Sequence, residues 1–263
     1  MTRFHRQPGR GDPKLFWKSL ALILGSSLAL SAQTISWKGH TWNINGGDPI
    51  GEGSAGGQIK GSMKNVTLDA KGCLHLKISG SGASATGAEI WSADKLGFGS
   101  IYYVFQGPIT AMPKSVVASG FLYGPAARIG KDGENELDIE FSQWNGTAGK
   151  INADFTFYPN TGQASLGASY EKNFFLDLGG STVATCRIDW SSTAVTASVW
   201  AGVVPPTAPT NTALKTHTYR GNMKTIPQPA CPMMFNLWTY GAYPDHDLDI
   251  TVEDFQFMPA GSK

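Results

Sequence analysis

The sequence predicts an all-β protein, either a sandwich or a barrel. Short segments rich in β-branched and aromatic residues recur along the chain, and Gly, Pro, Asn or Ser bounds each of them. No segment keeps an apolar period of 3.6 residues over three turns, so long helices are not expected. With 263 residues, of which 32 are Gly and 15 are Pro, the chain suits one β domain with a substantial core.

The expected strands follow one another with turn residues between them. Within residues 72–82, Leu74, Leu76 and Ile78 alternate with polar or charged residues, and this alternation is typical of a half-buried strand. The Pro-rich stretch 203–215 predicts a long surface loop rather than a domain linker, because strands resume after it with unchanged composition. The expected strands lie within 72–82, 99–107, 115–124, 150–162, 182–190, 193–202, 233–241 and 247–259.

The first 32 residues predict a secretory signal peptide. Five basic residues precede the apolar run 20–30, and small residues follow it. This run is shorter than the roughly 20 apolar residues that cross a bilayer, although an uncleaved N-terminal anchor is the alternative. We therefore expect a mature single domain of residues 33–263, without stable membrane association, located outside the cell or in the periplasm.

Composition and cysteine spacing exclude several classes of function. Charged residues are only 16% of the chain and no basic stripe is present, so a nucleic-acid partner is not expected. Cys73, Cys186 and Cys231 form an odd set, which leaves one disulfide and one free thiol open without fixing the pairing. No Cys or His spacing indicates a metal site, and the sequence predicts no cofactor.

The segment 136–141 alternates acidic and apolar residues without a break. On a strand, Glu136, Asp138 and Glu140 share one face, while the apolar residues between them point into the core. The apolar face fixes the register, because a slip of one residue would bury all three acids. A solvated strand face that carries these acids by chance is the alternative interpretation.

Glycoside hydrolysis gives this arrangement a chemical reason. The reaction needs one ionised carboxylate at the sugar and one protonated carboxyl for the leaving oxygen. A third carboxyl between them can push the two pKa values apart. On a flat strand the Cα atoms of Glu136 and Glu140 would lie about 13 Å apart, whereas retaining chemistry needs carboxyl groups about 5–5.5 Å apart. The hypothesis therefore requires a curved sheet.

These residues resemble the active-site strand of glycoside hydrolase family 16, which includes lichenases, laminarinases and xyloglucan transglycosylases. Their E-x-D-x-E spacing is similar to that of the lichenase and xyloglucan-transglycosylase branch. Further segments resemble the family in the same order across residues 87–258, namely AEIW, VVASGFLYG, RIDW and PMMFNLW. The resemblance implies a concanavalin-like β-jelly-roll sandwich of two curved antiparallel sheets, with the substrate cleft on the concave face.

The resemblance also implies roles for individual residues. Glu136 takes the position of the nucleophile, Asp138 that of the helper between, and Glu140 that of the acid/base in a reaction with retention. Four residues match positions that contact the glucan through hydroxyl groups or aromatic rings: Glu89, Asn236, Tyr123 and Trp238. Plain core packing is the alternative for the two rings, and a strand-edge hydrogen bond is the alternative for Asn236.

Several departures from the family pattern concern the substrate. Trp91 stands where lichenases resembling this chain carry Arg, and Trp144 either stacks on an acceptor-side sugar or caps the end of the sandwich. Arg128 and Lys131 belong to a loop near the expected cleft, where they either face an anionic sugar or are simply solvated. The family often binds a structural calcium ion, but no Asp-rich loop of the EF-hand type assigns its ligands here.

Together these features predict a secreted endo-β-glucanase that cleaves β-1,3/1,4- or β-1,3-glucans by double displacement. Its expected partner is the polysaccharide, and we expect a monomer. A transglycosylase acting on xyloglucan-type glycans is one alternative, because the sequence does not determine whether water or a sugar ends the cycle. A non-catalytic carbohydrate-binding jelly roll is the other, although a pure binder has no need of three crowded carboxylates.

Overall fold

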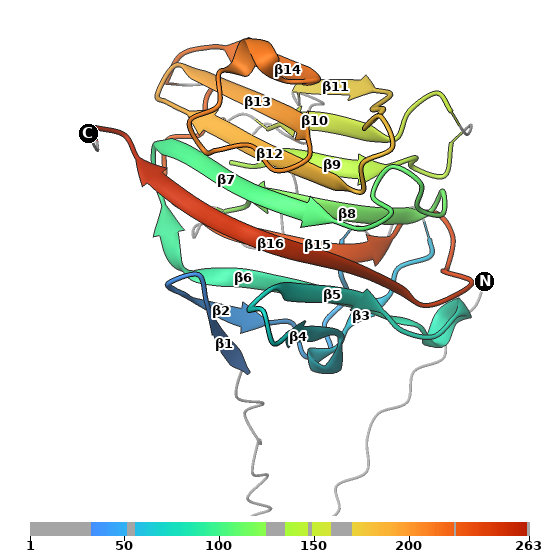
Figure 1. Cartoon of the computed structure of the whole chain (residues 1–263). Helices are drawn as coiled ribbons and strands as arrows, with labels where there is room; N and C mark the ends of the chain where they lie inside the picture. Colours follow the sequence, from blue (N-terminus) through green and yellow to red (C-terminus); the bar gives the residue numbers. More distant parts are fainter. Residues whose placement is uncertain are drawn as a thin grey trace, which may run out of the picture. The chain divides into compact units, whose positions relative to one another are not determined.

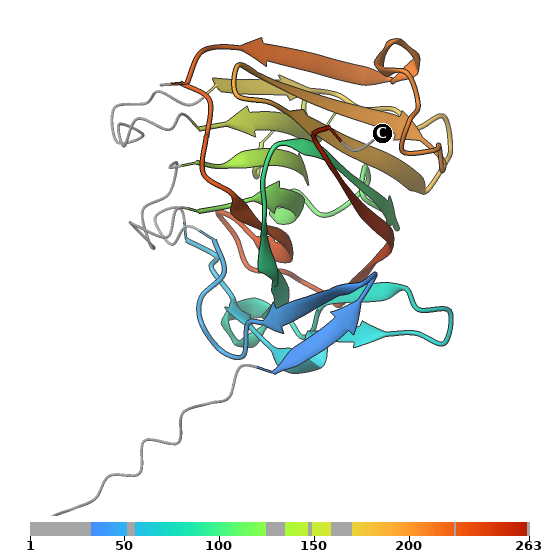
Figure 2. The ribbon, with the colours of Figure 1, turned by 90° about the vertical axis from the view of Figure 1, so that its left-hand side faces the viewer.

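Two layered β-sheets form the described part of the chain (Figures 1 and 2). The computed structural model describes residues 33–51, 56–124, 135–146, 149–158, 170–223 and 225–261. Contacts group Ala32–Lys263 into one compact unit. The expected signal peptide, Arg128 and Lys131 lie outside the described residues.

The nine-stranded sheet has the order β1-β2-β6-β15-β8-β9-β10-β11, and β3 pairs with β6 beside this path. All its pairs are antiparallel except the short β3–β6 pair, which is parallel. Its strands are β1 (Thr34–Trp37), β2 (His40–Ile44), β3 (Lys60–Gly61), β6 (Thr86–Leu96), β8 (Val116–Leu122), β9 (Leu137–Ser142), β10 (Ala153–Phe157), β11 (Tyr170–Phe174) and β15 (Cys231–Thr239).

The seven-stranded sheet has the order β14-β13-β12-β7-β16-β5-β4 and is antiparallel throughout. Its strands are β4 (Val66–Leu68), β5 (Leu74–Ile78), β7 (Gly99–Gln106), β12 (Val183–Trp190), β13 (Ala194–Ala201), β14 (Lys215–Arg220) and β16 (Leu248–Pro259). Single 3₁₀ turns occur at η2 (Met63–Asn65), η3 (Gly82–Ser84) and η5 (Thr210–Thr212). Neither sheet closes on itself, so the fold is a sandwich and not a barrel.

An aromatic cluster joins the two sheets beneath β9 and β15. The ring of Phe105 on β7 lies 5.9 Å from Phe141 of β9 and 5.9 Å from Phe235 of β15, both edge to face. Tyr103 contacts Phe235 in the same way at 5.3 Å, and its hydroxyl donates to the Gly120 carbonyl on β8. Each such buried ring stabilises the fold by roughly 1.5–3 kcal/mol. The packing fixes which face of β9 is turned toward the core.

The expected strands all appear, but the sequence reasoning missed others. β1 and β2 form a hairpin through Lys38 and Gly39, whose φ angles of 51° and 81° fit a two-residue turn of the primed type. β14 begins where the Pro-rich loop ends. This loop is anchored by Arg187, which donates from Nη1 to the carbonyls of Pro206 and Ala208 at 2.8 and 2.7 Å.

The three cysteines carry free thiols, so the disulfide left open by the sequence does not form in this structure. Cys186 and Cys231 are buried, while Cys73 is partly exposed. In the described ranges no helix has the length and apolar character needed to cross a membrane.

Candidate active site

The three acids of the 136–141 segment lie at the middle of the nine-stranded sheet. β9 pairs with β8 on one side and β10 on the other, so that Glu140 faces Ser119 across one pair and Asp154 across the other. Leu137, Ile139 and Phe141 are fully buried in the core, as the alternation predicts. All three acids therefore point to the opposite face of the sheet.

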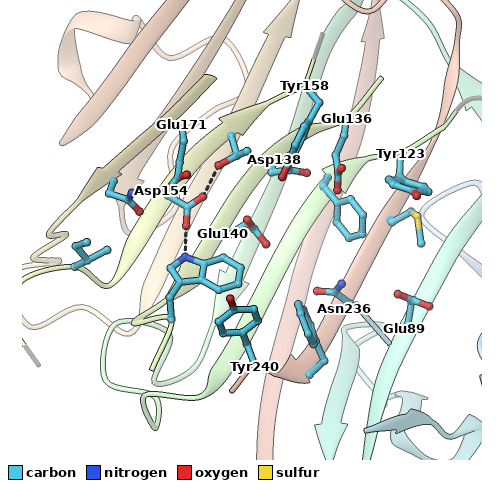
Figure 3. A pocket seen from close by; sticks show the side chains of 18 residues that line it. Glu89, Tyr123, Glu136, Asp138, Glu140, Asp154, Tyr158, Glu171, Asn236 and Tyr240 are labelled. Atoms are coloured by element: carbon cyan, nitrogen blue, oxygen red, sulfur yellow. Dashed lines mark hydrogen bonds between the residues drawn. The ribbon is translucent and has the colours of Figure 1, made fainter. Parts of the chain in front are cut away.

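This face carries a cleft of about 610 Å³ (Figure 3). Glu136, Asp138 and Glu140 all turn their carboxyl groups into it. The described lining comes from the nine-stranded sheet and its connecting loops, and consists of Gly51, Glu89, Phe121, Tyr123, Glu136, Asp138, Glu140, Trp144, Ile151, Asp154, Thr156, Tyr158, Glu171, Asn173, Met234, Asn236, Trp238 and Tyr240.

Asp138 is the most enclosed of the three acids of the 136–141 segment. Asp138 is only 3% exposed, and Glu136 and Glu140 are half-buried, so the segment is not an open, solvated strand face. Burial raises its pKa well above the ordinary value, and the charges of Glu136, Glu140 and Asp154 raise it further. The structure thus favours a protonated Asp138 between two glutamates.

Glu140 has an environment that also favours the protonated acid. Burial raises its pKa well above the ordinary value, and the neighbouring Asp154 is the next cause, with Glu136 adding to it. The hydroxyl of Ser119 donates to Glu140 Oε1 at 2.9 Å and offsets part of this rise. A carboxyl group that keeps its proton toward neutral pH can act as a general acid.

Asp154 is a fourth acid in the cleft that the sequence reasoning missed. It is 1% exposed, and its Oδ2 accepts a 2.7 Å hydrogen bond from the indole Nε1 of Trp144. Its Oδ1 accepts a 2.9 Å bond from the hydroxyl of Thr156 (Figure 3). Burial outweighs these bonds and raises the pKa of Asp154 to about 6.

Trp144 reaches Asp154 from an unusual backbone conformation. Its φ angle is 48°, a region that bulky L-residues rarely adopt, and Asn145 follows with 57°. The Trp144 backbone N–H donates to Ser142 Oγ at 2.9 Å, and its ring meets that of Tyr240 edge to face at 5.2 Å. The turn after β9 is therefore held so that the indole N–H points at the carboxylate on β10.

A second polar group lies at the other end of the cleft. Asn45 donates from Nδ2 to Glu89 Oε1 at 2.9 Å, and burial raises the pKa of Glu89 although bonds from Asn45 and Asn236 oppose the rise. Within the described structure, Asn236 Oδ1 and Trp238 Nε1 are buried polar atoms without a hydrogen-bond partner. Unpaired acceptors and donors in a cleft wall are suited to bind the hydroxyl groups of a ligand.

The cleft brings together eight of the nine residues that the sequence reasoning selected. Trp91 is the exception: it shares the strand face of Glu89, pairs with Met234 and Asn43, and lies further along β6, outside the lining. Trp238 is only 5% exposed, so its ring packs in the core and also lines the cleft.

The structure adds residues for which the sequence gave only an indirect signal. Asp154, Thr156 and Tyr158 alternate on β10 and its end, and all three line the cleft. Such alternation on the strand following β9 indicates that the three residues share one face, but it does not give their alignment with β9. Among the described residues, no group of three or more His, Cys, Asp and Glu side chains has the arrangement of a metal site.

Comparison with known proteins gives structural but not sequence matches. No protein-family model matches the sequence. No curated protein matches it either.

Solved structures match over most of their length. A Bacillus licheniformis β-glucanase aligns with a TM-score of 0.58 at 21% identity, covering 82% of this chain and 91% of the other. A Bacteroides ovatus family 16 endo-glucanase in complex with G4G3G-2F-DNP gives 0.60 at 15%, covering 82% and 94%. The catalytic domain of a Thermotoga petrophila laminarinase gives 0.60 at 14%, covering 87% and 95%. The chain therefore has the all-β sandwich fold of family 16 glucanases, as its motifs predict.

Proposed function

We propose that this protein is a secreted endo-β-glucanase that hydrolyses β-1,3/1,4- or β-1,3-glucans with retention. One observation carries the proposal: Glu136, Asp138 and Glu140 meet in a single cleft, where burial and mutual charge hold protons on two of them. The folds of the glucanase and laminarinase neighbours support glucan as the substrate class. The basic and apolar leader of residues 1–32 supports secretion.

In the first step Glu140 acts as the general acid. Its proton passes to the glycosidic oxygen as the bond from that oxygen to the anomeric carbon breaks. The Glu136 carboxylate forms a bond to the same carbon, which gives a covalent glycosyl-enzyme intermediate. In the second step Glu140 takes a proton from water, whose oxygen attacks the anomeric carbon and releases Glu136.

Asp138 keeps Glu136 and Glu140 in different protonation states. A proton held on Asp138 is available for a hydrogen bond to the Glu136 carboxylate, and such a bond stabilises the ionised form. Without this proton three adjacent carboxylates would repel one another. The arrangement thus separates an ionised nucleophile from a protonated acid on one short strand.

Glu89 and Asn236 form the polar wall that binds sugar hydroxyl groups. The acceptor Asn236 Oδ1 and the Glu89 carboxylate both take O–H donors, which every neutral glucan provides. Tyr123 follows β8 directly and lies edge to face with Phe121 at 6.3 Å. Aromatic rings in a glucan cleft pack against the apolar faces of the sugars.

Product analysis tests this function. The chain from Gln33 is incubated separately with mixed-linkage β-glucan and with β-1,3-glucan, and the products are identified by mass spectrometry and NMR. Short oligosaccharides whose new reducing ends are first released in the β configuration would support a retaining endo-glucanase. Products longer than the substrate would instead show a transglycosylase, and binding without cleavage would show a carbohydrate-binding protein. The matched control is Glu136→Gln, which should release nothing.

A further inference from the structure

We propose that Asp154 is a positioning residue for the acid/base, holding the proton of Glu140 in the empty cleft and drawing it back after each transfer. The inference rests on the proposed function, because it assigns Glu140 the acid/base role. Asp154 lies on β10, next to the strand that carries Asp138 and Glu140.

The register places the two carboxyl groups side by side. Asp154 is the direct cross-strand partner of Glu140 in the antiparallel β9–β10 pair, so their side chains share one face at neighbouring positions. The interaction of the two carboxyl groups across this pair favours the proton on Glu140 and the charge on Asp154. Like-charged residues directly opposite each other on a sheet destabilise it, so this pair is stable only while it shares a proton.

Two hydrogen bonds favour the ionised form of Asp154, although burial still raises its pKa to about 6. The Trp144 indole and the Thr156 hydroxyl donate to its two oxygens, and the neighbouring Glu140 also lowers the pKa of Asp154. The backbone of Trp144 adopts its rare positive φ where it makes this contact. A rare backbone conformation of a bulky residue persists only where the surrounding structure enforces it, and such residues cluster at functional sites. Here the conformation directs the Trp144 N–H at the buried Asp154 carboxylate, which supports a functional role for Asp154.

The other titratable groups around Asp154 are acids, and the charge of Glu171 opposes the two hydrogen bonds by raising the pKa of Asp154. Glu140 and Asp138 face it from β9, and Glu171 faces it from β11. All are acidic, and no described Lys, Arg or His lines the cleft. Within the described lining, Glu140 therefore shares its proton only with other acids. Among these acids, Asp154 accepts the most hydrogen bonds, from Trp144 and Thr156.

The proton balance over one cycle shows what Asp154 contributes. When Glu140 gives its proton to the leaving oxygen, two carboxylates remain opposite each other across the β9–β10 pair. Their repulsion favours the return of a proton to Glu140, which comes from the water that attacks the anomeric carbon. Asp154 thus makes Glu140 a weaker acid and a stronger base, and it favours the second step.

The test compares Asp154→Asn with the wild type and with Asp94→Asn. Asn is nearly isosteric, but it removes the charge and replaces one acceptor oxygen by an NH2 donor. Asp94 is an exposed acid on β6 outside the cleft lining. Two quantities are measured: the pH profile of kcat/KM on glucan, and the titration of Glu140 by ¹³C NMR, assigned with Glu140→Gln. The second measurement needs no turnover. Asp154→Glu, which keeps the charge, serves as the conservative variant.

We expect Asp154→Asn to move both the Glu140 titration and the alkaline limb of the profile to lower pH, while Asp94→Asn moves neither. Asp154→Glu should restore part of the wild-type position. An unmoved Glu140 titration would overturn the inference. An equal loss of kcat/KM, which reports the first step, on activated aryl glycosides and on glucan would also overturn it, because Asp154 would then act on the reacting atoms directly. If the wild type cleaves no glycan, the proposed function fails, and the titration alone decides whether Asp154 holds the proton.

Discussion

Asp154→Asn is expected to change how the stability of the protein depends on pH. In the folded protein the pKa of Asp154 is about 6, against an ordinary value of 3.8, because burial disfavours the charged form. Between these two pH values the folded state binds this proton and the unfolded chain does not. The stability gained from the protonated form is complete below about pH 4 and is lost as the pH rises to about 6.

The magnitude follows from the size of the rise. A pKa raised from 3.8 to about 6 corresponds to about 3 kcal/mol of unfolding free energy, at about 1.4 kcal/mol for each pH unit. Asn at this position does not titrate, so this part of the pH dependence disappears from the variant. Loss of the Asp154 charge also lowers the pKa values of Asp138 and Glu140, which changes the pH dependence in the same direction.

Urea unfolding at pH 4 and pH 7.5, followed by tryptophan fluorescence, measures the effect. The unfolding free energy of Asp154→Asn minus that of the wild type should be about 3 kcal/mol larger at pH 7.5 than at pH 4. Asp94→Asn should show no such difference. Residues that titrate in all three proteins contribute equally to each unfolding free energy, so their effect cancels when a variant is compared with the wild type. If the free-energy difference between Asp154→Asn and the wild type is the same at both pH values, the argument that burial raises the pKa of Asp154 is wrong.

Three further substitutions test the site. Glu136→Gln should abolish release of reducing ends without lowering the melting temperature, since it removes one of several clustered charges; substantial turnover would contradict its role as nucleophile. Glu140→Gln should slow glucan hydrolysis by about 10²–10⁴-fold and activated aryl glycosides much less in the first step, and equal losses on both substrates would exclude it as the acid. Gly51→Ala should destabilise the fold by about 1–3 kcal/mol and raise KM, because φ is +65° there and an added Cβ would lie 2.3 Å from the Trp238 ring; thermal melts and kinetics like those of the wild type would refute this.

The sequence was sufficient to predict β9 and the face on which its acids lie, because a strand has the simplest periodicity. Leu137, Ile139 and Phe141 had to face the core, and this placed all three acids on the other side. The expected strands appear for the same reason, since each alternates or is bounded by turn residues. The β1–β2 hairpin escaped notice although its Lys38–Gly39 turn is a recognisable signal.

Asp154 could not be predicted in the same way, because its role depends on register between strands. The connection from β9 to β10 decides which residue of β10 lies opposite Glu140, and no local pattern reports that alignment. Trp91 shows the opposite case: it shares the face of Glu89, yet the cleft ends before it. Alternation assigns a residue to a face, whereas membership of a site requires the position along the neighbouring strands as well.

The charge of the cleft connects the chemistry with the choice of substrate. Its described lining holds six carboxylic acids and no cation: Glu89, Glu136, Asp138, Glu140, Asp154 and Glu171. A cation beside Glu140 would lower the pKa of that acid and remove its proton, so the proposed mechanism requires this absence. These acids also disfavour a sulfated or carboxylated glycan, since like charges 4 Å apart near a protein surface repel by about 4 kcal/mol. A neutral glucan adds no charge and donates hydroxyl protons to these acceptors. The pattern that keeps Glu140 protonated is therefore also one that favours neutral glucans.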